Sequence, residues 1–434
     1  MKRFFKFTLP SIMSLWVYAL YTMVDGFFVA NFIGEIEFSA VNISMPLVTL
    51  LFALGILFSV GTQARVGYRL GKGEYDEANI IFSTGFTSLS ITGIIVSILL
   101  LIFLKPIANI LGANNLTHDF VLEYLGIILV FGVFFMVTYQ LEVLVKVDGY
   151  PHISMISVVT AAISNIVLDY LFIVPLNMGI CGAGLATGIS QVISTLLMLR
   201  HFILKKGRLR FTKKVDFKRL KTLLPLGFGD SISELSMGYT TFLFNNVLLK
   251  VFGQDGVIVF TVLSYVQVFA QSTMSGVSQG LAPLFSYDYG RGAYDLIKKS
   301  IKRGLVFVSL IAIFFYIFTY LFRVDVTQLF LSDSPNLQIE AAKAIKIFCI
   351  SFIFIGINLL MVTLFASLGM GRVASIISLL RTPILISVVM ALYYFYSGGD
   401  KIWYVLSISE GITTVISLGL MKKYILDVTK EKIK

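Results

Sequence analysis

Apolar residues occur in long runs along this chain, and short polar connections separate the runs. Such runs predict membrane-spanning helices, because about 20 consecutive apolar residues cross the ~30 Å hydrocarbon core of a bilayer. Twelve spans are predicted, at 8–32, 45–69, 84–104, 119–144, 151–173, 179–204, 223–249, 256–286, 303–322, 340–367, 373–396 and 402–424. The pattern therefore favours an all-α polytopic membrane protein.

The composition strengthens this prediction. Hydrophobic residues make up 57% of the 434 residues and charged residues only 14%, whereas soluble domains carry roughly 25% charged residues. No polar stretch is long enough for a separate soluble domain. The two cysteines, Cys181 and Cys349, are isolated in the sequence, so they indicate neither a disulfide framework nor a metal site.

The net charge of +11 does not indicate a nucleic-acid partner, because the basic residues gather in alternate connections. One set contains Arg69 and Lys72, then Lys146, then the run KKGRLRFTKKVDFKRLK at 205–221, whereas the connection 34–44 contains no Lys or Arg. The positive-inside rule places the basic set in the cytoplasm. We therefore expect a multi-pass protein of the cell (inner) membrane with both termini cytoplasmic.

The two halves of the chain resemble each other. SVGTQARVGYRLGKGEYD at 59–76 aligns with SQGLAPLFSYDYGRGAYD at 278–295, and VDGYPHIS at 147–154 falls opposite LGMGRVAS at 368–375. The repeat predicts two pseudo-symmetric six-helix lobes around a central cavity, a common transporter design. We assign the lobes to 1–204 and 223–434, and interpret the basic stretch 205–222 as a cytoplasmic linker that tethers them.

Two carboxylates lie deep inside predicted spans of the first half. Asp25 and Asp169 each interrupt an apolar run, where a charged side chain costs ~2.5–3.5 kcal/mol. Asn165, four residues before Asp169, shares its helix face, and Thr187 adds a hydroxyl in the next span, among small residues that permit close helix packing. These oxygens suit Na⁺ or a shared proton. A purely structural role, in which the polar groups join helices, is the alternative.

Other polar residues lie in spans of the second half. Glu234 and Asn245 fall in the seventh span, Arg381 in the eleventh and Glu410 in the twelfth. Glu234 could bind an ion or substrate or serve structure alone, whereas Arg381 is expected to neutralise a carboxylate within the bundle.

Catalytic motifs that would indicate an enzyme are missing. GFGD at 227–230 matches one element of intramembrane aspartyl proteases, but the Tyr-Asp pair that must precede it in an earlier span is absent. The sequence contains no HExxH and no P-loop. Transport driven by an ion gradient, with no cofactor, therefore remains the favoured interpretation.

The motifs YTMVDGFFVANFIG, NIVLDYLFI and MGICGAGLAT together resemble the multidrug and toxic compound extrusion (MATE) family. The resemblance covers essentially the whole chain. It implies twelve helices in two lobes, alternating access, and an antiporter that exports lipophilic organic cations or drugs in exchange for Na⁺ or H⁺.

The resemblance also implies roles for particular residues. It assigns the ion-coupling site, which is also the metal site if Na⁺ is used, to Asp25, Asn165, Asp169 and Thr187, with the carbonyl of Ala183. It links Tyr21 and Pro10 to bending of the first helix, and it matches Glu234 to a second-lobe carboxylate of some relatives. The other carboxylate of those relatives is missing from the tenth span here, which favours the first-lobe site. We group Tyr21, Pro10, Glu234, Asn245 and Arg381 as substrate or gating candidates.

Three other functions compete with this one. A lipid-linked saccharide flippase of the same superfold would need cationic residues to meet a pyrophosphate, whereas the charges within these spans are mostly acidic. An intramembrane enzyme lacks its catalytic pairs, and a receptor or scaffold would not explain the carboxylates. We therefore expect small organic cations and membrane lipids as partners, and a monomer.

Overall fold

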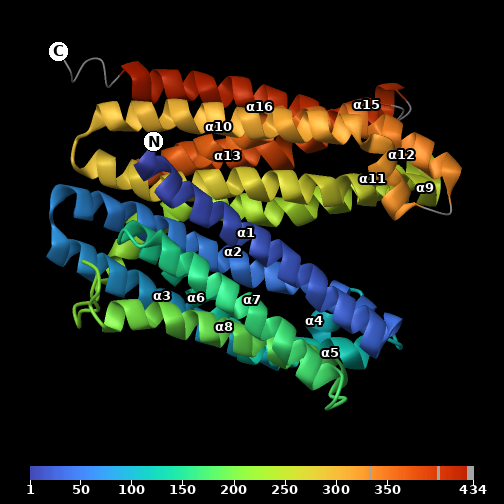
Figure 1. Cartoon of the computed structure of the whole chain (residues 1–434), viewed down its shortest axis with the longest axis horizontal. Coiled ribbons are helices and arrows are strands. Elements are labelled where there is room, and N and C mark those ends of the chain that lie inside the picture. The colour runs from blue at the N-terminus through green and yellow to red at the C-terminus, as the bar shows by residue number, and fades with distance from the viewer. Residues whose placement is uncertain (332–333, 398–400, 428–434) are drawn as a thin grey trace. The chain divides into compact units, whose positions relative to one another are not determined.

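The computed structural model describes residues 1–331, 334–397 and 401–427, and every regular element in these ranges is helical (Figure 1). The end of the basic tail, 428–434, which the sequence places in the cytoplasm, lies outside the described residues. The chain divides into two compact units between Gly227 and Phe228.

The N-terminal unit consists of eight α-helices and the beginning of a ninth. They are α1 (Lys2–Phe28), α2 (Glu35–Lys72), α3 (Tyr75–Ile102), α4 (Leu104–Ile110), α5 (His118–Val130), α6 (Gly132–Val147), α7 (Pro151–Ile173), α8 (Gly179–Ile203) and the first turns of α9 (Leu220–Gly290). A π-helical segment, Val29–Ile33, continues α1.

The C-terminal unit contains the rest of α9 and seven further helices among its described residues. They are α10 (Tyr294–Leu321), α11 (Arg323–Phe330), α12 (Pro335–Phe348), α13 (Phe352–Ser367), α14 (Gly371–Leu379), α15 (Leu385–Ser397) and α16 (Val405–Met421). A π-helical segment, Leu380–Ile384, joins α14 to α15.

The helices account for twelve membrane spans within the described ranges. Ten helical segments are individually long and apolar enough to cross a bilayer, and α5 with α6 forms an eleventh span that bends by 48°. Helix α9 has 71 residues and would be about 107 Å long if straight, more than three times the bilayer core. Gly253 breaks it with a non-helical φ of 65°, so α9 supplies two spans. The predicted number of spans is confirmed.

One predicted connection is wrong. The stretch 34–44 was expected as an outer loop, but α2 begins at Glu35 and only Gly34 separates it from the preceding helical segment. Glu35 and Glu37 lie in the first turn of α2, where the partial positive charge of the helix N-terminus stabilises carboxylates. Polar residues at a membrane boundary can therefore extend a span instead of ending it.

The order of elements repeats between the two units. Helices α3 and α10 have 28 residues each, and each is followed by a short helix, α4 or α11. Gly73 and Gly292 adopt left-handed conformations, with φ of 79° and 72°, two residues before α3 and α10 begin. This conformation favours glycine, so the aligned glycines of the two halves have the same role as turn residues.

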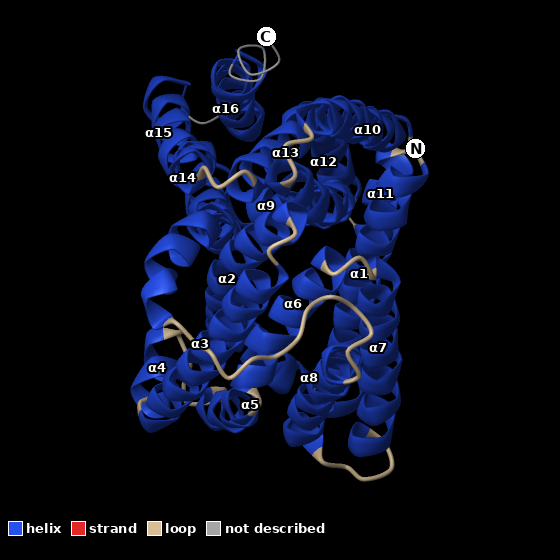
Figure 2. Cartoon of the chain, turned by 90° about the vertical axis from the view of Figure 1, so that its left-hand side faces the viewer, coloured by secondary structure: helices blue, strands red, loops and turns tan. Residues whose placement is uncertain are grey.

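The linker packs against the N-terminal unit over most of its length. Figure 2 shows it as a long loop that leaves α8 and crosses the end of this unit over α6 and α3. The Tyr150 hydroxyl, in the α6–α7 connection, donates to the Lys206 carbonyl at 2.9 Å, and Arg219 forms an ion pair with Glu77 of α3 at 2.6 Å. The basic connections of this unit therefore lie together at one end, as the charge pattern predicts.

Candidate functional site

The two carboxylates that the sequence singles out lie in the N-terminal unit on neighbouring helices. Helix α1, which carries Asp25, packs against α7, which carries Asn165 and Asp169. Asn165 and Asp169 are fully buried, and Asp25 is 9% exposed. The carboxyl groups of Asp25 and Asp169 lie close to each other. We call these two residues the acid pair.

Helix α8 completes the surroundings of the acid pair. The Asn165 amide donates to the Thr187 hydroxyl at 3.5 Å, and Ala183 lies buried one turn before Thr187. A small residue lets α8 approach α7 closely: a Cβ atom on Gly182 would lie 3.0 Å from the Cβ atom of Phe172. The structure therefore brings Asp25, Asn165, Asp169 and Thr187 together, with Ala183 on the adjoining turn of α8.

Several oxygen atoms of this cluster have no hydrogen-bond donor among the described residues. They are both carboxylate oxygens of Asp169, Oδ1 of Asp25 and Oδ1 of Asn165. An unsatisfied buried polar group costs about 1–3 kcal/mol, and a charged one more. A proton or a small cation would remove this cost. Carboxylate, amide and hydroxyl oxygens are hard ligands, so the residues fit Na⁺ or H⁺.

Tyrosines border the acid pair on two helices. Tyr21 lies one turn before Asp25 and is buried, and its ring meets that of Tyr18 edge to face at 5.2 Å between centroids. Tyr124 of α5 is also buried and lies near both carboxyl groups. The sequence analysis missed Tyr124, because no spacing relates it to either aspartate. A tyrosine inside an apolar run was the only available signal.

Pro10 lies on the same helix as Asp25 but far from it. Their separation of fifteen positions corresponds to about 22 Å of helix, and α1 continues through Pro10 without a break. Proline cannot donate a backbone hydrogen bond, which makes the preceding turn a point where a helix can bend. The π-helical segment after Phe28 lies nearer the acid pair, and such segments are frequent at functional sites.

Arg381 contacts a carboxylate in the C-terminal unit. Its Nε donates to Oε1 of Glu410 at 2.7 Å, and the Asn358 amide donates to Oε2 of Glu410 at 2.7 Å. The hydroxyls of Thr414 and Ser417 donate to the Asn358 amide oxygen. Arg381, Glu410 and Asn358 are all buried. Arg381 thus neutralises a carboxylate within the bundle, in the manner expected from the sequence.

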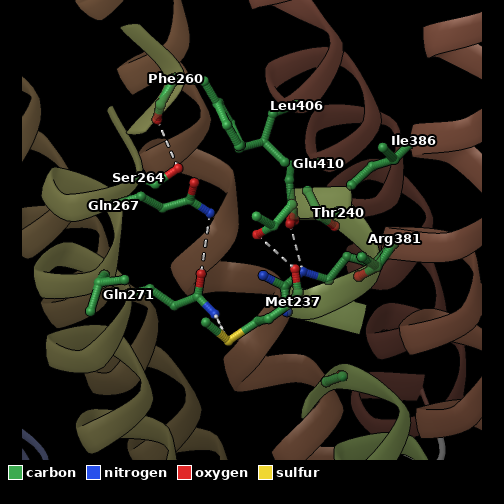
Figure 3. Close-up of a pocket in the computed structure, with 14 residues that line it drawn as sticks. Met237, Thr240, Phe260, Ser264, Gln267, Gln271, Arg381, Ile386, Leu406 and Glu410 are labelled. Carbon is green, nitrogen blue, oxygen red and sulfur yellow. Dashed lines mark hydrogen bonds and ion pairs between the residues drawn. The ribbon is translucent and has the colours of Figure 1, made fainter. Parts of the chain in front are cut away.

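The ion pair borders a pocket of about 80 Å³ lined mostly by polar side chains (Figure 3). Gln267 and Gln271 of α9 face Arg381 across it, and Met237 accepts a hydrogen bond from Gln271. Glu234 and Asn245 lie on the first half of α9 but are not among the described residues that line this pocket. The structure therefore does not join Glu234 or Asn245 to Arg381.

Breaking the Arg381–Glu410 pair should destabilise the protein. Glu410→Leu leaves a buried guanidinium without its partner, which costs about 3–5 kcal/mol in comparable pairs. We expect a clear drop in the thermal unfolding temperature of the purified protein. The double variant Arg381→Met/Glu410→Leu should recover much of the loss, because no unpaired charge remains. An unchanged unfolding temperature in Glu410→Leu would contradict a structural role for the pair.

Comparisons with known proteins agree with this architecture. The MatE family model matches residues 10–171 and 240–392, more than half of the chain. The multidrug export protein MepA of Staphylococcus haemolyticus (strain JCSC1435) is 26% identical, over 97% of this chain and 93% of its own length. MepA of Staphylococcus aureus (strain MSSA476) is 24% identical, over 96% and 92%.

A solved structure confirms the fold. An outward-facing conformation of a multidrug resistance MATE family transporter of the MOP superfamily superposes with a TM-score of 0.92, at 21% identity, over 99% of this chain and 96% of that one. The match of the family model over most of the chain establishes the relationship that the sequence motifs suggested. The chain belongs to the MatE family, the multidrug and toxic compound extrusion (MATE) transporters.

Proposed function

We propose that the chain exports lipophilic organic cations by antiport against Na⁺ or H⁺, with the acid pair as its coupling site. The observation that carries the proposal is the buried cluster of Asp25, Asn165 and Asp169, in which four side-chain oxygens have no donor among the described residues. Relatives that are named multidrug export proteins support drugs as the cargo.

The chain's own groups suggest how an ion could drive the cycle. With neither proton nor cation, the two carboxylates repel each other in a region of low dielectric constant. A bound ion cancels this repulsion and draws α1 toward α7 and α8. Tyr21 and the π-helical segment Val29–Ile33 lie on the part of α1 that would move, and Pro10 allows the distant half of the helix to follow. An ion that binds one conformation more tightly shifts the population toward it.

The C-terminal unit offers less support for a coupling site. Glu234 is half-buried on α9 and Asn245 leaves its Oδ1 without a described partner. The α12–α13 segment has only Glu340 as a carboxylate, near its beginning. Asn358 of the same segment already bonds to Glu410. We therefore favour the N-terminal acid pair and keep Glu234 and Asn245 as substrate or gating candidates.

The charges of the described spans favour cationic cargo over a lipid-linked pyrophosphate. Arg381, which could otherwise meet a phosphate, is neutralised by Glu410 at 2.7 Å. The location of the basic connections at one end of the N-terminal unit supports cytoplasmic termini in the cell membrane. We propose a monomer that needs no cofactor, with lobes at 1–204 and 223–434.

A transport assay in proteoliposomes tests this function directly. Purified protein should move a fluorescent lipophilic cation such as ethidium against its gradient when a pH or Na⁺ gradient of inward direction is imposed. Collapsing the active gradient with an ionophore should stop transport. One gradient should suffice, and its identity names the coupling ion. If neither gradient moves the cation in wild-type vesicles, the proposal of ion-driven export fails.

A further inference from the structure

The linker between α8 and α9 carries an unusual concentration of positive charge. We call residues 205–221 the basic strap. It contains one carboxylate, Asp216, and nine cationic side chains, on Lys205, Lys206, Arg208, Arg210, Lys213, Lys214, Lys218, Arg219 and Lys221. Positive charge near a cytoplasmic membrane end is ordinary. The unusual feature of the strap is the way in which its backbone is held in place.

Side chains of the N-terminal unit hold the backbone at the start of the strap. Oδ1 of Asp148 accepts hydrogen bonds from the amides of Arg208, at 2.8 Å, and Leu209, at 3.1 Å. The other oxygen of this carboxylate bonds to His201 at 2.7 Å. A Cβ atom on Gly207 would overlap the Asp148 carboxylate. Glycine at this position therefore lets the strap reach its anchor.

Helix α3 holds the rest of the strap in the same way. Its Asn79, Ser83 and Thr84 side chains accept hydrogen bonds from three strap amides at 2.8, 2.9 and 3.1 Å, those of Arg210, Thr212 and Asp216 respectively. Leu209 is fully buried. The Phe211 ring packs 4.6 Å from that of Phe82. The strap thus has a fixed backbone path.

Because the backbone faces the helices, most of the cationic side chains face away from them; Arg208 instead lies over the ring of Tyr75 at the start of α3, 5.5 Å from its centroid. All except Arg219 are exposed, and Arg219 pairs with Glu77 and with Asp216, the strap's single carboxylate. Seven further cations are exposed on the strap, with no acidic residue of the strap left to balance them. A fixed array loses less conformational entropy on binding than a flexible loop would.

Large apolar side chains are exposed among these cations. Phe217 within the strap is 51% exposed, and Ile203 and Leu204 just before it are 65% and 52% exposed. Both ends of the strap join membrane spans, and its middle bonds to the first turns of α3, so the strap stays at the level of the helix ends. Cations beside exposed apolar groups at this level suit the boundary between lipid headgroups and acyl chains. A soluble polyanion would contact only the cations of the strap and would leave the apolar side chains exposed.

We propose that the basic strap is a binding surface for anionic phospholipid headgroups. The ligand is the phosphate of an anionic lipid such as phosphatidylglycerol, whose acyl chains would contact Ile203, Leu204 and Phe217. The fixed path of the strap sets the spacing of the cations that receive the phosphates.

Lipid titration of the full-length protein tests the proposal. Protein in a neutral detergent is titrated with phosphatidylglycerol or phosphatidylcholine, and bound lipid is counted by native mass spectrometry. The strap variant is Lys213→Gln/Lys214→Gln/Lys218→Gln. The matched control, Lys299→Gln/Lys302→Gln/Arg303→Gln on α10, removes the same charge from exposed positions elsewhere.

We expect the wild-type protein and the α10 control to bind phosphatidylglycerol more tightly than phosphatidylcholine. The strap variant should bind phosphatidylglycerol at least about tenfold more weakly than the wild type, because each cation near an anionic surface contributes roughly 1 kcal/mol. Phe217→Ser should weaken phosphatidylglycerol binding without changing the affinity for glycerol phosphate. An equal loss of phosphatidylglycerol binding in the two triple variants would mean that only net charge matters, and it would overturn the proposal. So would binding of glycerol phosphate or a short RNA as tight as that of the lipid.

Discussion

Asp169→Asn should abolish gradient-driven export while the protein folds normally. The substitution keeps the shape of the side chain and removes the negative charge that would attract a cation or accept a proton. Both carboxylate oxygens lack a donor among the described residues, so the charge is costly to the fold, and its removal should leave the thermal unfolding temperature equal or higher. Efflux of ethidium from proteoliposomes under a pH or Na⁺ gradient, measured beside thermal unfolding, tests both expectations.

Two further variants make this result specific. Asp76→Asn is the same chemical change at an exposed position in the first turn of α3, and its transport should equal that of the wild type. Glu234→Gln, in the other unit, should retain ion-driven transport if the acid pair is the only site that couples ion binding to transport. Normal efflux by Asp169→Asn would refute the assignment of the acid pair. An inactive Asp169→Asn with a raised unfolding temperature would show that the residue serves function at the expense of stability.

The spans were the most predictable part of this protein. Hydropathy alone gave their number, because no backbone other than a helix satisfies its hydrogen bonds within lipid in a chain of this pattern. The helix ends were less predictable. Residues 34–44 are polar enough to look like a loop, yet α2 begins at Glu35, because the N-terminus of a helix stabilises acidic residues and the membrane boundary tolerates them.

The candidate site could be predicted only as far as local spacing reaches. Asn165 and Asp169 are four residues apart, and helical geometry alone puts them on one face. Asp25 was conspicuous because a carboxylate in an apolar run is costly, but its approach to Asp169 depends on how α1 packs against α7. Tyr124 gave no comparable signal: tyrosine is common at membrane boundaries, and only the tertiary fold brings this one to the acid pair.

The linker shows a different limit of sequence analysis. A run of nine cations with one carboxylate is typical of a solvated tether, and its charge gives no hint of a fixed path. The path comes from backbone amides that bond to Asp148, Asn79, Ser83 and Thr84, residues far away in the sequence. Backbone amides are the same at every position, so no residue pattern in the strap predicts these hydrogen bonds.

Asp25→Asn should uncouple drug binding from ion binding. In an antiporter the two ligands oppose each other, and linkage requires each to weaken the other by the same factor. Saturating the wild-type protein with the coupling ion should therefore lower its affinity for a fluorescent lipophilic cation. In Asp25→Asn the ion site loses one of two neighbouring carboxyl groups, so drug affinity should no longer respond to the ion. Fluorescence titration of purified protein across pH, with and without Na⁺, measures the response.

The double variant Asp25→Asn/Asp169→Asn shows whether the two carboxylates act as one site. If they share a single ion, either substitution alone removes nearly all ion binding, and the second adds little. If they bind ions independently, the two losses in binding free energy add. Because the carboxyl groups approach each other in a buried cluster, we expect strong non-additivity. Full ion sensitivity of drug affinity in Asp25→Asn would exclude the acid pair as the coupling site and would direct attention to Glu234, which lies half-buried on α9 in the other unit.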